Sequence, residues 1–141
     1  EETFIDNCSQ QLIKNPSIFN QSIILSTNLF MDIISEEASG LIGSIGTVYS
    51  ANIGDRYAMF EPAHGSSPKY KGQNKVDPVA TILSGAWMLG YLGEEKASSA
   101  IFAATRDVIE AGKITTYDLG GSAKTSEMSN AIATRLVKIL K

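Results

Sequence analysis

The sequence predicts an α/β domain in which short apolar strands alternate with helices in a parallel or mixed sheet. Two runs, residues 22–26 (SIILS) and 57–62 (YAMFEP), are short, apolar and bounded by polar or turn-forming residues, as buried strands are. Longer segments with apolar side chains at helical spacing lie between and after them, and several end at a glycine. This alternation is typical of a sheet with helices packed on it.

The first half of the chain is expected to hold two helices. Residues 1–14 carry apolar side chains at helical spacing, and the Asn-Pro pair that follows ends this helix. After the first strand, Asn28 is a good N-cap for a helix that runs to about Gly43. From there to Gly54 the glycine spacing indicates irregular chain, with a candidate strand at 47–50.

The second half is expected to hold three helices. Asp77 as cap and Pro78 as first helical residue begin a helix that ends at Gly93. A second helix covers 94–111 and also ends at a glycine, and a connection rich in turn formers leads to a last helix at about 126–140. The sequence shows no internal repeat.

The composition fits a folded domain and excludes several classes of protein. The chain has 141 residues, 43% of them hydrophobic, so it can form a core as one domain or as a piece of a larger one. The net charge of −3 argues against nucleic acid as a partner, and no apolar run reaches the roughly 18–20 residues of a membrane span. Cys8, the only cysteine, excludes a disulfide framework and fits a reducing, cytoplasmic setting. The sequence starts with Glu-Glu-Thr, without an initiator methionine or a signal peptide, so we expect that it begins inside a longer chain.

Two acidic residues on the helix from Asn28 form a candidate metal pair. Asp32 and Glu36 are four residues apart, so their Cβ atoms lie about 5–6 Å apart on one helix face. Such carboxylates repel each other unless a cation lies between them, and Mg²⁺ or Mn²⁺ prefers oxygen ligands. A solvated acidic face, extended by Glu37, is the alternative that the spacing leaves open.

The stretch from 61 to 78, EPAHGSSPKYKGQNKVDP, is a candidate ligand-binding loop. Lys69 beside Tyr70 offers a cation and a phenol to a phosphate or a flat ring, and Gly65 lets the backbone approach a ligand. A lone histidine in a loop is more often a structural hydrogen-bonding residue than a catalytic base. The chain contains no P-loop, no GxGxxG and no GxSxG motif. The residues alone therefore indicate a phosphate-binding loop and a candidate metal pair.

Two segments resemble a known enzyme family. Residues 51–89 (ANIGDRYAMFEPAHGSSPKYKGQNKVDPVATILSGAWML) resemble the C-terminal half of the β-decarboxylating dehydrogenases, which act on isocitrate, 3-isopropylmalate, homoisocitrate or tartrate. Residues 28–39 (NLFMDIISEEAS) resemble that family's metal-binding helix. The resemblance implies part of the isopropylmalate/isocitrate dehydrogenase fold, a mixed sheet flanked by helices, with the N-terminal half of the enzyme absent. It places residues 1–42 in a small, dimer-forming domain and 43–141 in a large cofactor-binding domain.

The resemblance also implies a divalent metal site for Mg²⁺ or Mn²⁺. Asp32 corresponds to the first carboxylate ligand, and Glu36 stands where the family has a second Asp. Asp6 resembles the aspartate that completes the metal site of the neighbouring subunit, which implies a homodimer of the parent enzyme. Asp6 and Asp32 are thus the implied catalytic residues. Met31 replaces a glycine of the family and is expected to crowd the backbone there.

The implied cofactor is NADP, with NAD as the alternative. Lys69-Tyr70 is the pattern of the NADP enzymes, whereas NAD enzymes carry Asp-Ile. Tyr117 matches a further phosphate contact of NADP-linked members, although Gly121 stands where those enzymes have an arginine. The resemblance places these residues around the adenosine half of the cofactor, with Asp77 in place of the usual Asn: His64, Gly65, Ser66, Ser67, Val76 and Asp77.

Isocitrate is the substrate that the resemblance favours, with 3-isopropylmalate or homoisocitrate as alternatives. The family's substrate-binding arginines and its catalytic tyrosine and lysine have no counterpart in this sequence. We therefore expect a fragment or one chain of a split enzyme that is inactive alone. There are two alternatives: an isolated nucleotide-binding module, and a non-catalytic regulatory or structural subunit. Met31 and Glu36, which depart from the family's metal-binding helix, would fit the non-catalytic subunit.

Overall fold

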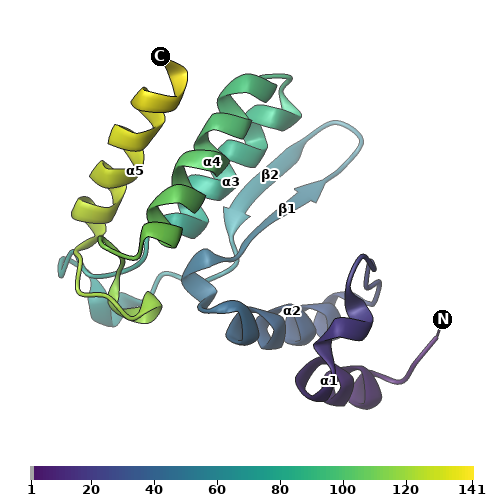
Figure 1. Ribbon diagram of the computed structural model, residues 1–141. Helices are drawn as coiled ribbons and strands as arrows, with labels where there is room; N and C mark the ends of the chain where they lie inside the picture. Colours follow the sequence, from purple (N-terminus) through teal and green to yellow (C-terminus); the bar gives the residue numbers. More distant parts are fainter. Residues whose placement is uncertain (1) are drawn as a thin grey trace. The chain divides into compact units, whose positions relative to one another are not determined.

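The computed structural model describes residues 2–141 and divides the chain into two compact units, 1–43 and 44–141 (Figure 1). Each unit has its own hydrophobic cluster. No helix within residues 2–141 is both long and apolar enough to cross a membrane. The division into a small domain (1–42) and a large domain (43–141) remains a prediction.

The first unit contains the two helices that the sequence predicts. Helix α1 (Ile5–Lys14) is followed by a 3₁₀ turn, and helix α2 (Asn28–Ile42) ends at Gly43, where φ is 147°. The N-cap position of α2 is Thr27, one residue earlier than expected. The two helices pack through a small buried cluster of Cys8, Leu12 and Ile34.

The strand expected at residues 22–26 is not formed, and that prediction is wrong. Ile23 and Leu25 are each 89% exposed, while Ile24 between them packs against the cluster of the first unit. No strand within residues 2–141 pairs with this run. Apolar, β-branched composition favours an extended chain, but a strand also needs a hydrogen-bonded neighbour.

The second unit begins with a β-hairpin. Strands β1 (Tyr49–Ile53) and β2 (Ala58–Pro62) run antiparallel, with Ala51 opposite Phe60. The strand expected at 57–62 is thus confirmed, and the candidate strand at 47–50 begins two residues later and ends three residues later than expected. Within residues 2–141 this hairpin is the only sheet, so the parallel or mixed pairing is not seen there. The α/β class is confirmed.

Three helices follow the hairpin in sequence and in space: α3 (Val79–Tyr91), α4 (Glu95–Ala111) and α5 (Thr125–Leu140). Helix α3 packs on the hairpin, α4 on α3 and α5 on α4 (Figure 1). The Trp87 ring lies edge-on to the rings of Tyr49 and Phe60, with centroids 5.8 and 5.7 Å away. Buried Val79, Ala104, Met128 and Ile132 join the helices into one core.

Candidate functional site

The loop between β2 and α3 is anchored at its start and folded into tight turns. The Ala63 N–H donates to the Val48 carbonyl oxygen at 3.0 Å, just before β1. Ser67 takes a left-handed conformation, with φ at 40°, and its carbonyl oxygen accepts from the Tyr70 N–H at 2.9 Å. These turns place Lys69 and Tyr70 side by side on a short 3₁₀ segment.

The later part of the loop is tied to the N-terminus of α5. The Asn74 side chain donates to Ser126 Oγ at 2.8 Å and accepts from the Ser126 N–H at 3.0 Å. The Thr125 N–H donates to the Asn74 carbonyl oxygen, and the Thr125 hydroxyl donates to that of Val76. Residues about 50 positions apart in sequence therefore fix the backbone on both sides of Lys75.

Four side chains meet on the surface of this loop, and we call them the Lys–Tyr cluster: Lys69, Tyr70, Lys75 and Tyr117. The two tyrosine rings lie 6.2 Å apart at their centroids and are tilted by 50°. Lys75 Nζ is 4.6 Å from the Tyr117 ring centroid and 5.5 Å from that of Tyr70. Lys69 Nζ is 4.8 Å from the Tyr70 centroid. The structure thus brings together three predicted site residues and one lysine that was not predicted.

The electrostatics of the cluster suit a phosphate. The interaction with the Tyr117 hydroxyl lowers the pKa of Tyr70, with a further contribution from the Lys69 ammonium. The same interaction raises the pKa of Tyr117. Two ammonium groups and two phenols supply the charge-assisted donors that a phosphate dianion accepts.

A second network lies beneath the loop, around the buried carboxyl of Asp77. Its Oδ1 accepts from the Val79 N–H at 2.8 Å, at the start of α3, while its Oδ2 has no hydrogen-bond partner. Burial, and to a smaller extent the neighbouring Asp118 carboxylate, raises the pKa of Asp77 to about 6. Asp118 accepts hydrogen bonds from Ser44 Oγ and Thr116 Oγ1, each at 2.6 Å. This network fixes the turn that carries Tyr117 beside the start of α3.

The remaining residues assigned to the adenosine half lie on the same loop. His64 is half-buried; its Nδ1 is 2.9 Å from the Gly65 carbonyl oxygen, and its Nε2 is buried without a partner. A side chain at Gly65 would meet open space, so no close contact within the chain requires glycine there. The other predicted cofactor contacts are exposed: Ser66, Ser67 and Val76. Their contact with a nucleotide remains a prediction.

The structure explains why position 121 is a glycine, although the NADP enzymes that the sequence resembles have an arginine there. A Cβ at this position would collide with the Thr115 carbonyl oxygen. The Gly121 N–H also donates to the Thr116 carbonyl oxygen at 2.9 Å, which closes the turn around Tyr117. No side chain fits here unless the backbone moves, so position 121 cannot supply a cation to the cluster.

The predicted metal ligands lie in the first unit. Asp32 is exposed and Glu36 half-buried on α2, and Asp6 is exposed on α1. Residues 2–141 contain no group of three or more His, Cys, Asp or Glu side chains that could hold a metal, so these three do not form one site. Met31 packs against the apolar cluster of this unit. Two carboxylates four residues apart suit a hard divalent ion whose other ligands come from elsewhere.

Sequence reasoning missed three residues of the second unit. Lys75 belongs to the Lys–Tyr cluster, and Asp118 and Ser44 hold the turn that carries Tyr117. Asp118 and Ser44 are 74 residues apart in sequence, so no local pattern connects them. For Lys75 a signal was present, because a third lysine in a loop already assigned to phosphate is itself a candidate contact.

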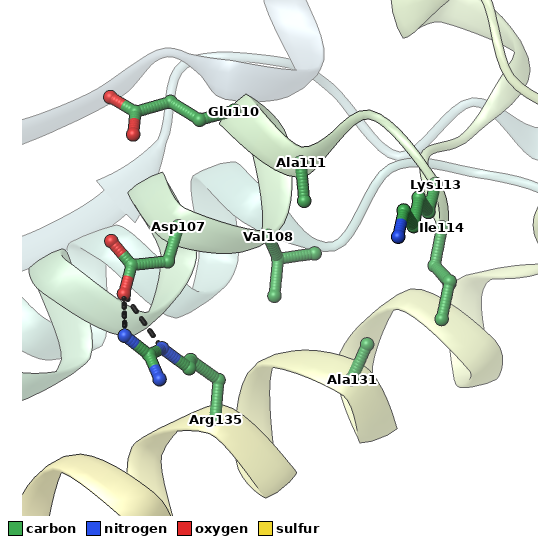
Figure 2. A pocket seen from close by; sticks show the side chains of 8 residues that line it. All are labelled: Asp107, Val108, Glu110, Ala111, Lys113, Ile114, Ala131 and Arg135. Atoms are coloured by element: carbon green, nitrogen blue, oxygen red, sulfur yellow. Dashed lines mark hydrogen bonds and ion pairs between the residues drawn. The ribbon is translucent and has the colours of Figure 1, made fainter.

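A surface hollow of about 620 Å³ lies elsewhere, between the end of α4 and α5 (Figure 2). Arg135 donates from Nε and Nη2 to Asp107 Oδ2, at 2.7 and 2.6 Å. The other charged lining residues are Glu110 and Lys113, so acidic and basic groups balance. The hollow shares no residue with loop 61–78 or the Lys–Tyr cluster, and its charges do not favour an anionic nucleotide.

Known proteins are similar to almost the whole chain. The profile of the isocitrate/isopropylmalate dehydrogenase family matches residues 1–132. The 3-isopropylmalate/3-methylmalate dehydrogenase of Methanocaldococcus jannaschii is 42% identical over 136 residues, which cover 96% of this chain and 40% of that protein. The NAD isocitrate dehydrogenase catalytic subunit 5 of Arabidopsis thaliana mitochondria is 42% identical over 137 residues, 96% of this chain and 36% of that protein.

A solved structure agrees with these relatives. The crystal structure of isocitrate dehydrogenase from Methylococcus capsulatus matches with a TM-score of 0.90 at 40% identity, over 95% of this chain and 40% of that one. The chain therefore spans 36–40% of the length of these proteins, and its fold is a part of theirs.

Proposed function

Because the chain belongs to the isocitrate/isopropylmalate dehydrogenase family, we propose that it forms the C-terminal part of an NADP-dependent isocitrate dehydrogenase. In the proposed reaction the C2–H of isocitrate leaves as hydride to the nicotinamide and the hydroxyl loses its proton. The β-carboxylate on C3 then leaves as CO₂, and the enolate that remains takes up a proton at C3. The products are 2-oxoglutarate, CO₂ and NADPH.

The Lys–Tyr cluster is the observation that carries the choice of NADP. NAD and NADP differ only in the 2′-phosphate of the adenosine ribose. The cluster offers two ammonium groups and two phenol hydroxyls at one point of loop 61–78, with no salt bridge from either lysine within residues 2–141. An uncompensated positive site of this kind favours a phosphate over a neutral hydroxyl.

The acidic helix supports the choice of a metal-dependent reaction. Asp32 and Glu36 would hold Mg²⁺ or Mn²⁺, and Asp6 would complete the equivalent site of a second subunit in a homodimer. When bound, the metal acts as a Lewis acid that stabilises negative charge developing on the substrate oxygen. Asp32 and Glu36 contribute the negative charge that positions it. The proposed location of the enzyme is the cytoplasm.

Isocitrate is proposed as substrate because of the resemblance of the segments SANIGD (50–55) and PKYKGQNKV (68–76) to isocitrate dehydrogenases. Steady-state assays of the natural full-length protein with Mg²⁺ test this choice, using isocitrate, homoisocitrate and 3-isopropylmalate, each with NADP and with NAD. We expect the highest kcat/KM for isocitrate with NADP. A higher value for 3-isopropylmalate, or for NAD with every acid, would contradict the proposal.

A non-catalytic subunit is the second candidate, favoured by Met31 and Glu36, the two departures from the family's metal-binding helix. The same assay separates the two. A protein that binds NADP but turns over none of the three acids with Mg²⁺ or Mn²⁺ supports the non-catalytic subunit. The 141-residue chain by itself is expected to bind nucleotide weakly and to show no turnover, because the substrate-binding arginines of the family have no counterpart in it.

A further inference from the structure

We propose that Lys75 is the second cation of the 2′-phosphate site and therefore determines the preference for NADP together with Lys69. The inference rests on the proposed function, because it deepens the assignment of the Lys–Tyr cluster to that phosphate. The resemblance assigned Lys69, Tyr70 and Tyr117 to this phosphate and gave Lys75 no role.

The position of Lys75 follows from its neighbours. Asn74 and Val76, on either side, are both hydrogen-bonded to the first residues of α5. The backbone of Lys75 is therefore held although the residue is exposed. Its Nζ lies 4.6 Å from the centroid of the Tyr117 ring and 5.5 Å from that of the Tyr70 ring, so it is close to both phenols that are assigned to the phosphate.

The ammonium group of Lys75 is available to a ligand. No carboxylate within residues 2–141 forms a salt bridge with it; its neighbours are aromatic faces. A cation–π contact at an exposed site is weak, so a phosphate dianion can draw the ammonium away from the rings. The tyrosine rings thus hold the cation close to where the phosphate would bind.

The backbone at Gly121 leaves no room for a cationic side chain in that turn. A side chain there would collide with the Thr115 carbonyl oxygen, so an arginine cannot reach the cluster from that turn. Lys75, which belongs to loop 61–78 and not to the turn at Gly121, contacts the Tyr117 ring. Lys75 in loop 61–78 therefore provides a positive charge near Tyr117 that a side chain at position 121 cannot provide.

The test uses 2′,5′-ADP and 5′-AMP, which differ in the 2′-phosphate, in calorimetric titrations of the natural full-length protein. Lys75→Met is expected to weaken 2′,5′-ADP about tenfold, the effect of one charge-assisted contact, and to leave 5′-AMP within twofold. Lys75→Arg keeps the cation and should stay within about threefold for both ligands. Lys71→Met, which removes the same charge from the same loop without an aromatic contact, should change neither.

The outcomes separate this inference from the proposed function. If the unmodified protein binds both ligands equally, the NADP assignment fails and the inference fails with it. If Lys69→Met loses the preference for 2′,5′-ADP but Lys75→Met keeps it, the NADP assignment stands and the role of Lys75 is overturned. Equal weakening of both ligands by Lys75→Met would also overturn it, because a structural effect acts on both.

Discussion

The loop of the second unit and the acidic helix of the first unit carry the predicted functional residues, but they differ in what fixes them. In loop 61–78, hydrogen bonds to Val48, just before β1, and to α5 fix the backbone, and two lysines and one tyrosine of the loop meet Tyr117. On α2, Asp32 is exposed and has no third acidic or histidine partner within residues 2–141. The proposed phosphate site thus lies within one unit, whereas the proposed metal site would need ligands beyond Asp32 and Glu36.

The largest effect is expected on the acidic helix. Asp32→Asn should lower kcat of the natural protein about 100- to 1,000-fold, because a lost metal ligand removes several kcal/mol of charge stabilisation. Its affinity for NADP, measured by calorimetry without metal, should not change.

Glu37→Gln is the matched control on the same helix. It removes one charge but leaves an oxygen for the hydrogen bond from Ser9 Oγ, so kcat should stay within about twofold. Full activity of Asp32→Asn with an unaltered Mg²⁺ dependence would exclude the metal role of the helix.

The next effect concerns the loop. The double change Lys69→Asp and Tyr70→Ile should lower the ratio of kcat/KM for NADP to that for NAD about 100-fold, through the loss of two charge-assisted contacts. Lys71→Asp reverses a charge in the same loop and should leave the ratio nearly unchanged. An unchanged ratio in the double variant would remove the basis for assigning the Lys–Tyr cluster to the cofactor.

The anchoring of the loop predicts a stability effect. Asn74→Ala deletes two side-chain hydrogen bonds to Ser126 and should destabilise the protein by about 1–2 kcal/mol in urea unfolding. Because the same hydrogen bonds hold the backbone of Lys75, NADP should weaken more than NAD. Asn130→Ala, at an exposed position of α5, serves as control. Equal weakening of NADP and NAD in Asn74→Ala would show that Asn74 does not position Lys75 for the phosphate.

The smallest effect depends on pH. Because the pKa of Asp77 is raised from 3.8 to about 6, the folded state keeps a proton that the unfolded state releases between these values. This carboxyl therefore stabilises the fold below about pH 4, and its contribution is lost as the pH rises through about 6. Asp77→Asn keeps the oxygen that accepts from Val79 and removes the buried charge.

At pH 8 we expect Asp77→Asn to raise Tm by a few degrees, roughly the effect of 1 kcal/mol in a domain of this size, and to change it little at pH 4. Thermal unfolding followed by circular dichroism at both values measures the difference. A lower Tm at pH 8 would show that the Asp77 charge is compensated in the folded state.

The sequence predicted the helices well because their signals are local. Helix α4 ends at Gly112, where φ is 62°, as a C-terminal glycine should. The run 22–26 failed because a strand depends on a partner that its own composition cannot reveal. Lys69 and Tyr70 were predicted from the residues and from the resemblance, and Tyr117 from the resemblance. For Lys75 the sequence showed only a further lysine in the loop, and its place beside the Tyr117 ring is seen only in the folded structure.

A crystal structure of the natural full-length protein with NADP bound is the most direct test of the central claim. The account predicts that the 2′-phosphate oxygens lie at hydrogen-bond distance, about 3 Å, from Nζ of Lys69 and Lys75 and from the hydroxyls of Tyr70 and Tyr117. A well-ordered NADP whose 2′-phosphate points into solvent, or is bound by residues outside this cluster, would contradict it.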